Sequence, residues 1–210
     1  MGRYPNIQKG LSYIIPAALA ELAGMLYLSV TENTEAPMLL TLLAFILLFA
    51  GTILETTGAL SAEKDISKHF TQAKLITVLG IFSTGLALFF FVIPQTEFKW
   101  LSGALNRISP IWYALIELEI LLGCKSVSPE EKRSRVNTAI MLIIILTVVE
   151  IFLRNILTLD FISDENAAAK TSSGITIAVA CMEAARAAIY IISVLLTKSL
   201  LKKSTDSQAV

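Results

Sequence analysis

The chain has 210 residues, of which 55% are hydrophobic and only 16% charged, and its formal net charge is +0. A soluble domain normally carries about 25% charged residues. This composition therefore excludes an ordinary soluble protein and indicates a polytopic membrane protein. The balanced charge and the lack of a basic, aromatic-rich cluster exclude a nucleic-acid-binding role. Because the segments between apolar runs are short, we expect a single membrane domain.

Apolar segments of about 20 residues predict membrane-spanning helices. The chain contains six, at residues 10–30, 38–60, 72–93, 101–123, 136–160 and 172–197. Loop-forming residues separate them at Thr31–Pro37, Ser61–Lys68, Pro94–Trp100, Ser126–Arg135 and Ser163–Lys170. The expected fold is therefore an all-α bundle of six transmembrane helices. Arg107 and Pro110 interrupt the start of the fourth segment, so five or seven spans remain alternatives.

Lysine and arginine gather on one side of the predicted bundle. That side has Arg3, Lys9, Lys64, Lys68, Lys74, Lys125, Lys132, Arg133, Arg135, Lys198, Lys202 and Lys203. The other side has Lys99 and Lys170, with Arg107 at the interface. Because short cytoplasmic loops are enriched in these residues, both termini are expected in the cytoplasm, at the plasma membrane or an internal membrane. Residues 1–9 would be a cytoplasmic N-terminus, 10–200 the membrane domain and 201–210 a disordered cytoplasmic tail.

A short internal similarity links the two halves of the chain. Ala18–Leu22 in the first span resembles Ala114–Leu118 in the fourth, and Pro16 and Pro110 precede them. Two three-helix halves in series have opposite orientations, which is the inverted-repeat plan of many secondary transporters. A weak 3+3 inverted repeat is therefore one hypothesis, and the biased composition of apolar helices is the other explanation of the match.

Cysteine and histidine give little sign of a cofactor. In the predicted topology Cys124 and Cys181 differ in depth by roughly 20 Å at 1.5 Å per residue, which is too far for a disulfide. The only histidine, His69, falls in a polar loop, whereas haem or histidine-rich metal sites need several imidazoles within the helices. We therefore predict no cofactor and no metal.

The most informative feature is a set of charged residues inside these apolar segments. They are Glu21, Glu55, Glu117, Glu119, Glu150 and Glu183, with Arg154 four residues after Glu150 and Arg186 three after Glu183. A charge at the bilayer centre costs roughly 2.5–3.5 kcal/mol on the insertion scale, so such residues usually face the protein interior and find partners. If Arg107 is included, the apolar segments contain six acids and three arginines. Desolvation favours the protonated form of the carboxyls left without a cation.

Helical spacing arranges these charges in stripes. The fifth span aligns Thr147, Glu150 and Arg154, and the sixth aligns Thr176, Glu183, Arg186 and Tyr190. One interpretation is that each Glu–Arg pair neutralises itself within its own helix and fixes helix packing. The other is that the two stripes face each other and line one polar cavity. Glu21, Glu150, Glu183 and Arg186 are expected within roughly 5 Å of the bilayer midplane.

The first four spans carry further patterns. Small residues share a face with Glu21 in the first span and with Glu55 in the second, which predicts close helix packing. Glu117 and Glu119 point about 160° apart, so both cannot line the same cavity. Glu117 shares a face with Tyr113 and is the better interior candidate, whereas Glu119 lies nearer the cytoplasmic surface.

Two functions from different classes fit these features. The first is a small proton-coupled transporter or exchanger of a small cationic or polar solute. Its candidate solute- and proton-binding residues are Glu21, Glu117, Glu150, Arg154, Glu183, Arg186 and Tyr190. The second is a non-catalytic membrane subunit or scaffold, homo- or hetero-oligomeric, whose buried ion pairs fix helix packing and partner choice. Glu119 can discriminate between the two functions. If it faces lipid, a helix of a partner must cover it, which favours the scaffold.

An enzyme is the least favoured class. The segment Glu150-Ile-Phe-Leu-Arg154 resembles part of the glutamate–arginine motif of the intramembrane CAAX-type proteases. That family also requires adjacent glutamates and histidines on other helices, which this chain lacks. None of the common nucleotide-binding, zinc-protease or nucleophile-elbow motifs is present either.

Overall fold

The computed structural model describes the backbone of residues 4–31, 37–92, 99–157 and 165–206, with side chains for 4–31, 37–66, 68–92, 110–154 and 174–202. Within these ranges the chain forms six helices and no strand. The helices are α1 (Pro5–Thr31), α2 (Met38–Glu63), α3 (Ser67–Val92), α4 (Lys99–Val127), α5 (Glu130–Leu157) and α6 (Glu165–Asp206). The all-helical expectation is confirmed.

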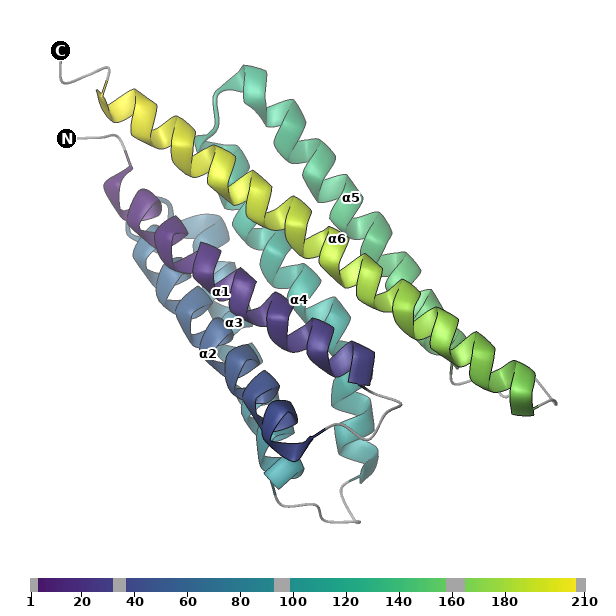
Figure 1. The fold of residues 1–210 in the computed structure, drawn as a ribbon. Coiled ribbons are helices and arrows are strands. Elements are labelled where there is room, and N and C mark those ends of the chain that lie inside the picture. Colours follow the sequence, from purple (N-terminus) through teal and green to yellow (C-terminus); the bar gives the residue numbers. More distant parts are fainter. Residues whose placement is uncertain (1–3, 32–36, 93–98, 158–164, 207–210) are drawn as a thin grey trace.

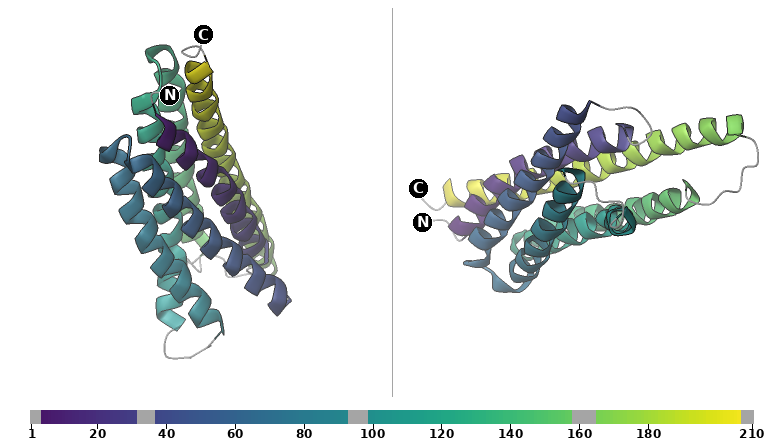
Figure 2. Two further views of the ribbon diagram at one scale, coloured as in Figure 1. Left: turned by 90° about the vertical axis from the view of Figure 1, so that its left-hand side faces the viewer. Right: turned by 90° about the horizontal axis from the view of Figure 1, so that it is seen from below.

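The helices run up and down, and each packs against the next one in sequence (Figure 1). The long α6 returns to pack against α1 as well as α5 and touches α4, so it closes the bundle. Figure 2 shows that both termini lie at the same end, together with the α2–α3 and α4–α5 turns. The segments that carry most of the flanking lysine and arginine therefore share one end of the bundle.

Five of the helices, α1, α2, α3, α5 and α6, are long and apolar enough to cross a membrane. The part of α4 with described side chains, residues 110–127, holds three charges, Glu117, Glu119 and Lys125, and α4 is not among these five helices. Large apolar side chains point outward, among them Leu39 (76% exposed), Phe82 (67%) and Phe152 (64%). An outer surface of this kind suits lipid and not water. The fold is therefore a helical bundle of the integral membrane type.

Several helices extend beyond the predicted apolar segments. His69, predicted in a loop, lies in the first turn of α3, and Glu130–Lys132 open α5 instead of forming a turn. In addition, α6 continues to Asp206, into the segment predicted as a cytoplasmic tail. Hydropathy marks only the part of a helix that lies in hydrocarbon, whereas Lys, Glu and Gln favour helix in water as well. The 3+3 inverted repeat stays a prediction, and residues 207–210 lie outside the described ranges.

An apolar core fills the half of the bundle nearest the termini. Its buried side chains include Ile7, Leu11, Ile14, Phe70, Ile116, Ile120, Leu121, Ile143 and Val194. Towards the opposite end, the same helices α1, α4, α5 and α6 bury polar and charged groups instead. The core therefore separates the buried charges from the end of the bundle that carries the termini.

Small residues bring α1 and α2 into close contact, as the sequence pattern predicted. A methyl group added at Gly58 would lie 2.6 Å from Ile14 Cγ1 and 2.8 Å from the carbonyl oxygen of Gly10. A methyl group at Gly51 would lie 2.5 Å from Cγ of Glu21. In lipid, helix association depends on such van der Waals contact, because the tails are as apolar as the side chains. The glycines thus set how closely Glu21 approaches α2.

The start of α1 is held by the α2–α3 turn. The Asp65 carboxylate accepts hydrogen bonds from the backbone N–H groups of Asn6 (2.8 Å) and Ile7 (3.0 Å) and from Asn6 Nδ2 (2.8 Å). The first N–H groups of a helix have no partner within it and carry a partial positive charge. Asp65 therefore caps α1 from a distant position in the sequence.

We expect Gly58→Ala to destabilise the α1–α2 contact by about 1–3 kcal/mol, since the added methyl overpacks a closed interface. Thermal unfolding in a mild detergent measures this loss. Gly85→Ala is the matched control, because its methyl would lie at an ordinary 3.5 Å from Phe49 Cε2. Equal melting temperatures for the two variants would contradict the close packing.

Asp65→Ala should lower stability by about 0.5–2 kcal/mol through loss of the cap, and Asp65→Asn should recover part of it because one acceptor oxygen remains. The melting temperature of the purified protein reports both. Ser12→Ala serves as control, since the exposed Ser12 hydroxyl donates only to the carbonyl of Gln8 in its own helix. A cap that contributes nothing would leave Asp65→Ala indistinguishable from Ser12→Ala.

Candidate functional site

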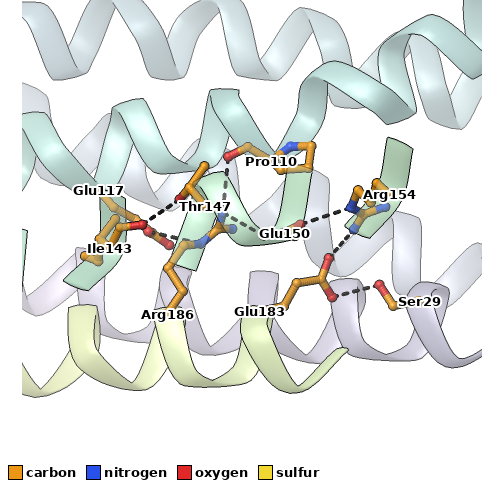
Figure 3. A network of polar contacts seen from close by, with 9 residues as sticks. All are labelled: Ser29, Pro110, Glu117, Ile143, Thr147, Glu150, Arg154, Glu183 and Arg186. Atoms are coloured by element: carbon orange, nitrogen blue, oxygen red, sulfur yellow. Dashed lines mark hydrogen bonds and ion pairs between the residues drawn. The ribbon is translucent and has the colours of Figure 1, made fainter. Parts of the chain in front are cut away.

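Four helices bring polar side chains together in the half of the bundle away from the termini. The group, called here the charge network, consists of Ser29 of α1, Glu117 of α4, Glu150 and Arg154 of α5, and Glu183 and Arg186 of α6 (Figure 3). Arg154 is the most exposed side chain among its ion pairs, at 17%. All the charges except Arg154 are almost fully buried, as expected for charges in a membrane protein.

Arg154 joins α5 to α6. Its Nε lies 3.1 Å from Glu150 Oε1 in the same helix, and its Nη2 lies 2.6 Å from Glu183 Oε1 across the interface. The other oxygen of Glu183 accepts a hydrogen bond of 2.7 Å from the Ser29 hydroxyl on α1. Both oxygens of Glu183 are therefore occupied, and α1, α5 and α6 meet at this carboxylate.

Arg186 makes the second set of links. Its Nη1 donates to Glu150 Oε2 at 3.2 Å and to the carbonyl oxygen of Pro110 at 3.1 Å. Its Nε lies 3.3 Å from Glu117 Oε2, an ion pair without good hydrogen-bond alignment. Arg186 thus ties α6 to α4 and α5, and its Nη2 has no hydrogen-bond partner among the described residues.

These contacts decide between the two interpretations of the stripes. Glu150 and Arg154 do pair within α5, but Glu183 and Arg186 pair with other helices and not with each other. The stripes of α5 and α6 therefore face each other, as the second interpretation required. The second interpretation also expected the two stripes to line a polar cavity. Instead they are in direct contact, through the ion pairs Arg154–Glu183 (2.6 Å) and Arg186–Glu150 (3.2 Å).

A second polar group lies next to the network. We call it the carboxyl cluster: Glu21 of α1, Glu55 of α2, Tyr113 of α4 and Tyr190 of α6, all at most 7% exposed. Tyr190 was predicted to line the same face as Arg186, but its hydroxyl donates to Glu55 Oε1 at 2.7 Å. Glu21 is close enough to interact electrostatically with Glu55, Glu117 and Arg186. The structure therefore divides the seven predicted site residues between two adjoining groups.

Ser29, Glu55 and Tyr113 are interior residues of these two groups that the predicted site leaves out. Glu55 lies on the glycine-rich face of α2, for which close packing is favoured over a pathway on the sequence pattern. The sequence pattern could have identified Glu55 as a site residue. Gly51, Glu55 and Gly58 share one face of α2, so the face that contacts α1 also carries the Glu55 carboxyl. Tyr113 was identified only as a neighbour of Glu117 on α4, and it is buried as that pattern predicted.

The remaining candidates are placed more simply. Glu119 has Oε2 3.3 Å from His69 Nδ1 and is 21% exposed, so it has a partner on α3 within this chain. Glu119 is therefore not an acid that faces lipid without a partner, which would have favoured the scaffold. The Arg107 side chain lies outside the described ranges. Among the described residues, no group of three His, Cys, Asp or Glu is arranged to hold a metal ion.

We expect Arg186→Met to lower stability by about 3–5 kcal/mol, because it leaves Glu117 and Glu150 buried with fewer cationic partners. The melting temperature in detergent measures this effect. Arg133→Met is the control: Arg133 is 45% exposed and pairs with an exposed Glu130, so its loss should cost at most about 1 kcal/mol. Similar losses in both variants would mean that the network does not hold the helices together.

Comparison of the chain with protein-family models, curated proteins and solved structures found no match. A helical bundle alone does not indicate a function, because one fold carries many functions. The function is therefore inferred from the residues of the charge network and the carboxyl cluster.

Proposed function

We propose that this protein is a small proton-coupled transporter or exchanger of a small cationic or polar solute. One observation carries the proposal: the interior holds five buried glutamates, Glu21, Glu55, Glu117, Glu150 and Glu183, but only two arginines, Arg154 and Arg186, among the described side chains. Three carboxyl groups thus exceed the cations. A buried negative charge is stable only when it is paired or protonated. Such an interior suits a protein that binds cations or protons.

The charge network is the proposed solute site. Arg154 is the least buried of its charges and holds Glu183 through a single short ion pair. A cationic solute can replace Arg154 on Glu183 without leaving a carboxylate unpaired. The hydroxyl of Ser29 would remain as a second polar contact. Because Glu183 joins three helices, such an exchange would also change how α1, α5 and α6 pack.

The proposed topology places six helices across the membrane with both termini in the cytoplasm. It is supported by the common end shared by the termini and the basic turns (Figure 1). In this orientation the charge network lies toward the side opposite the cytoplasm. The apolar core then closes the cytoplasmic side, so transport requires that core to open in an alternate state.

A second function, the non-catalytic subunit or scaffold, has its own supporting observation. Except for Arg154 with Glu150, the ion pairs of the charge network join different helices, and all four oxygens of Glu150 and Glu183 are partnered. A buried network of this kind can fix helix register. The scaffold does not explain why the neighbouring carboxyl cluster contains acids without a cation.

Proton uptake into proteoliposomes, followed with an internal pH dye, tests the transport proposal. A pH gradient is imposed, and small amines and cations are added in turn. We expect solute-dependent flux in the wild type. We expect Glu183→Gln to reduce it about 10–100-fold, since a hydrogen bond to a charged group contributes about 1.5–3 kcal/mol.

Glu119→Gln is the matched control, because Glu119 lies outside the network and its change should leave flux intact. Absence of flux for every solute, with wild-type protein correctly inserted, would reject transport. In that case a marked drop in the melting temperature of Glu183→Gln would favour the scaffold.

A further inference from the structure

The carboxyl cluster contains two acids for which no cation is in hydrogen-bonding contact. Glu21 is 5% exposed and Glu55 is 1% exposed. Glu21 Oε1 and Glu55 Oε2 have no hydrogen-bond partner among the described residues. The side chain of Glu21 lies against Gly51 of α2, one helical turn from Glu55. Two buried carboxyl groups therefore approach each other across the close α1–α2 contact.

The acids of the charge network differ from this pair. Glu150 receives hydrogen bonds from Arg154 and Arg186 on its two oxygens, and Glu183 from Arg154 and Ser29. Each of these carboxylates has an arginine within hydrogen-bonding distance. For Glu21 and Glu55 no salt bridge within 4.0 Å is formed by the described residues. The difference is one of partners and not of burial, since all four are almost fully buried.

Tyrosine hydroxyl groups supply a separate indication that the pair binds something. Tyr190 donates to Glu55 Oε1 at 2.7 Å. The Tyr113 hydroxyl is buried, lies near Thr52, Glu21 and Glu55, and forms no hydrogen bond of good geometry among the described residues. A hydroxyl can donate to a carboxylate and can accept from a carboxylic acid. Its place beside two acids therefore suits a site whose protonation changes.

We propose that Glu21 and Glu55 form a proton-binding site in which one exchangeable proton is held between the carboxyl pair and the Tyr113 and Tyr190 hydroxyls. The proton adds to a carboxylate oxygen to give a neutral carboxylic acid, which removes the charge that has no cation. A proton needs no cavity, which fits the close packing at Gly51. The inference rests on the proposed transport function, of which it names the proton site.

The other charged groups around the pair connect it to the charge network. Glu117 of α4 and Arg186 of α6 both interact electrostatically with Glu21, and Arg186 also pairs with Glu117 and Glu150. Arg186 Nη2 has no hydrogen-bond partner among the described residues. If Arg186 moves toward Glu21, it favours release of the proton and weakens its hold on Glu150. Arg186 therefore links proton binding to the solute site.

Infrared difference spectroscopy of the full-length protein in lipid tests the site with the proton alone as ligand. We expect a carbonyl band of a protonated carboxyl that shifts in heavy water and disappears as the pH is raised. Glu21→Gln and Glu55→Gln should each remove at least half of this band. Glu119→Gln should leave it unchanged. Melting temperatures of the same samples identify any variant that fails to fold.

Two results would overturn the inference: no protonated carboxyl band in the wild type at any pH, or a band that folded Glu21→Gln and Glu55→Gln retain in full. Should both variants fail to fold, Tyr190→Phe serves instead, since loss of its hydroxyl removes the 2.7 Å hydrogen bond to Glu55 and must shift the band of that carboxyl. An unshifted band in folded Tyr190→Phe also overturns the site.

The transport proposal fails separately from the proton site. A band assigned to Glu21 and Glu55 together with no solute-dependent flux would leave the proton site standing and reject transport. Solute-dependent proton flux without such a band would keep transport and reject this site.

Discussion

The interior of this protein depends on Arg186. Its side chain is 1% exposed and is the largest among the fully buried described residues. An isolated cation at this depth would be prohibitively costly. It is stable because Glu117, Glu150 and the Pro110 carbonyl surround it with negative or partially negative oxygens. These partners come from α4 and α5, so the position of three helices is coupled to one charge.

Two different forces therefore hold the two sides of the bundle. On one side α1 and α2 associate through glycine-mediated van der Waals contact, and on the other side α4, α5 and α6 associate through ion pairs. Lipid tails compete with apolar packing but cannot replace a salt bridge. Another ion is needed to displace the ion pairs. The α1–α2 contact depends instead on the small size of its glycines, which no solute changes. The charged side is thus the part of the bundle in which the proposed solute site lies.

The carboxyl cluster lies where these two sides meet. Glu21 belongs to the close α1–α2 contact and interacts with Arg186 of the charge network. The glycines bring the acids together, and the network supplies a cation, Arg186, that interacts with Glu21. A change in charge at Glu21 must therefore affect Arg186, which gives a physical route between the proposed proton site and the proposed solute site. The apolar core at the other end keeps this region away from the termini.

The amino-acid sequence is enough to predict the membrane class, the six helical segments and the burial of Glu21, Glu117, Glu150, Glu183 and Arg186. Hydropathy and helical spacing are local properties, so they can be counted along the chain. The sequence did not predict that α6 continues to Asp206, because hydropathy does not detect the part of a helix that lies in water. The partners become known from the folded bundle: Glu183 pairs with Arg154 and not with Arg186, and Tyr190 pairs with Glu55. Partner choice depends on which helix faces which, and each stripe of charges allowed several pairings until packing selected one.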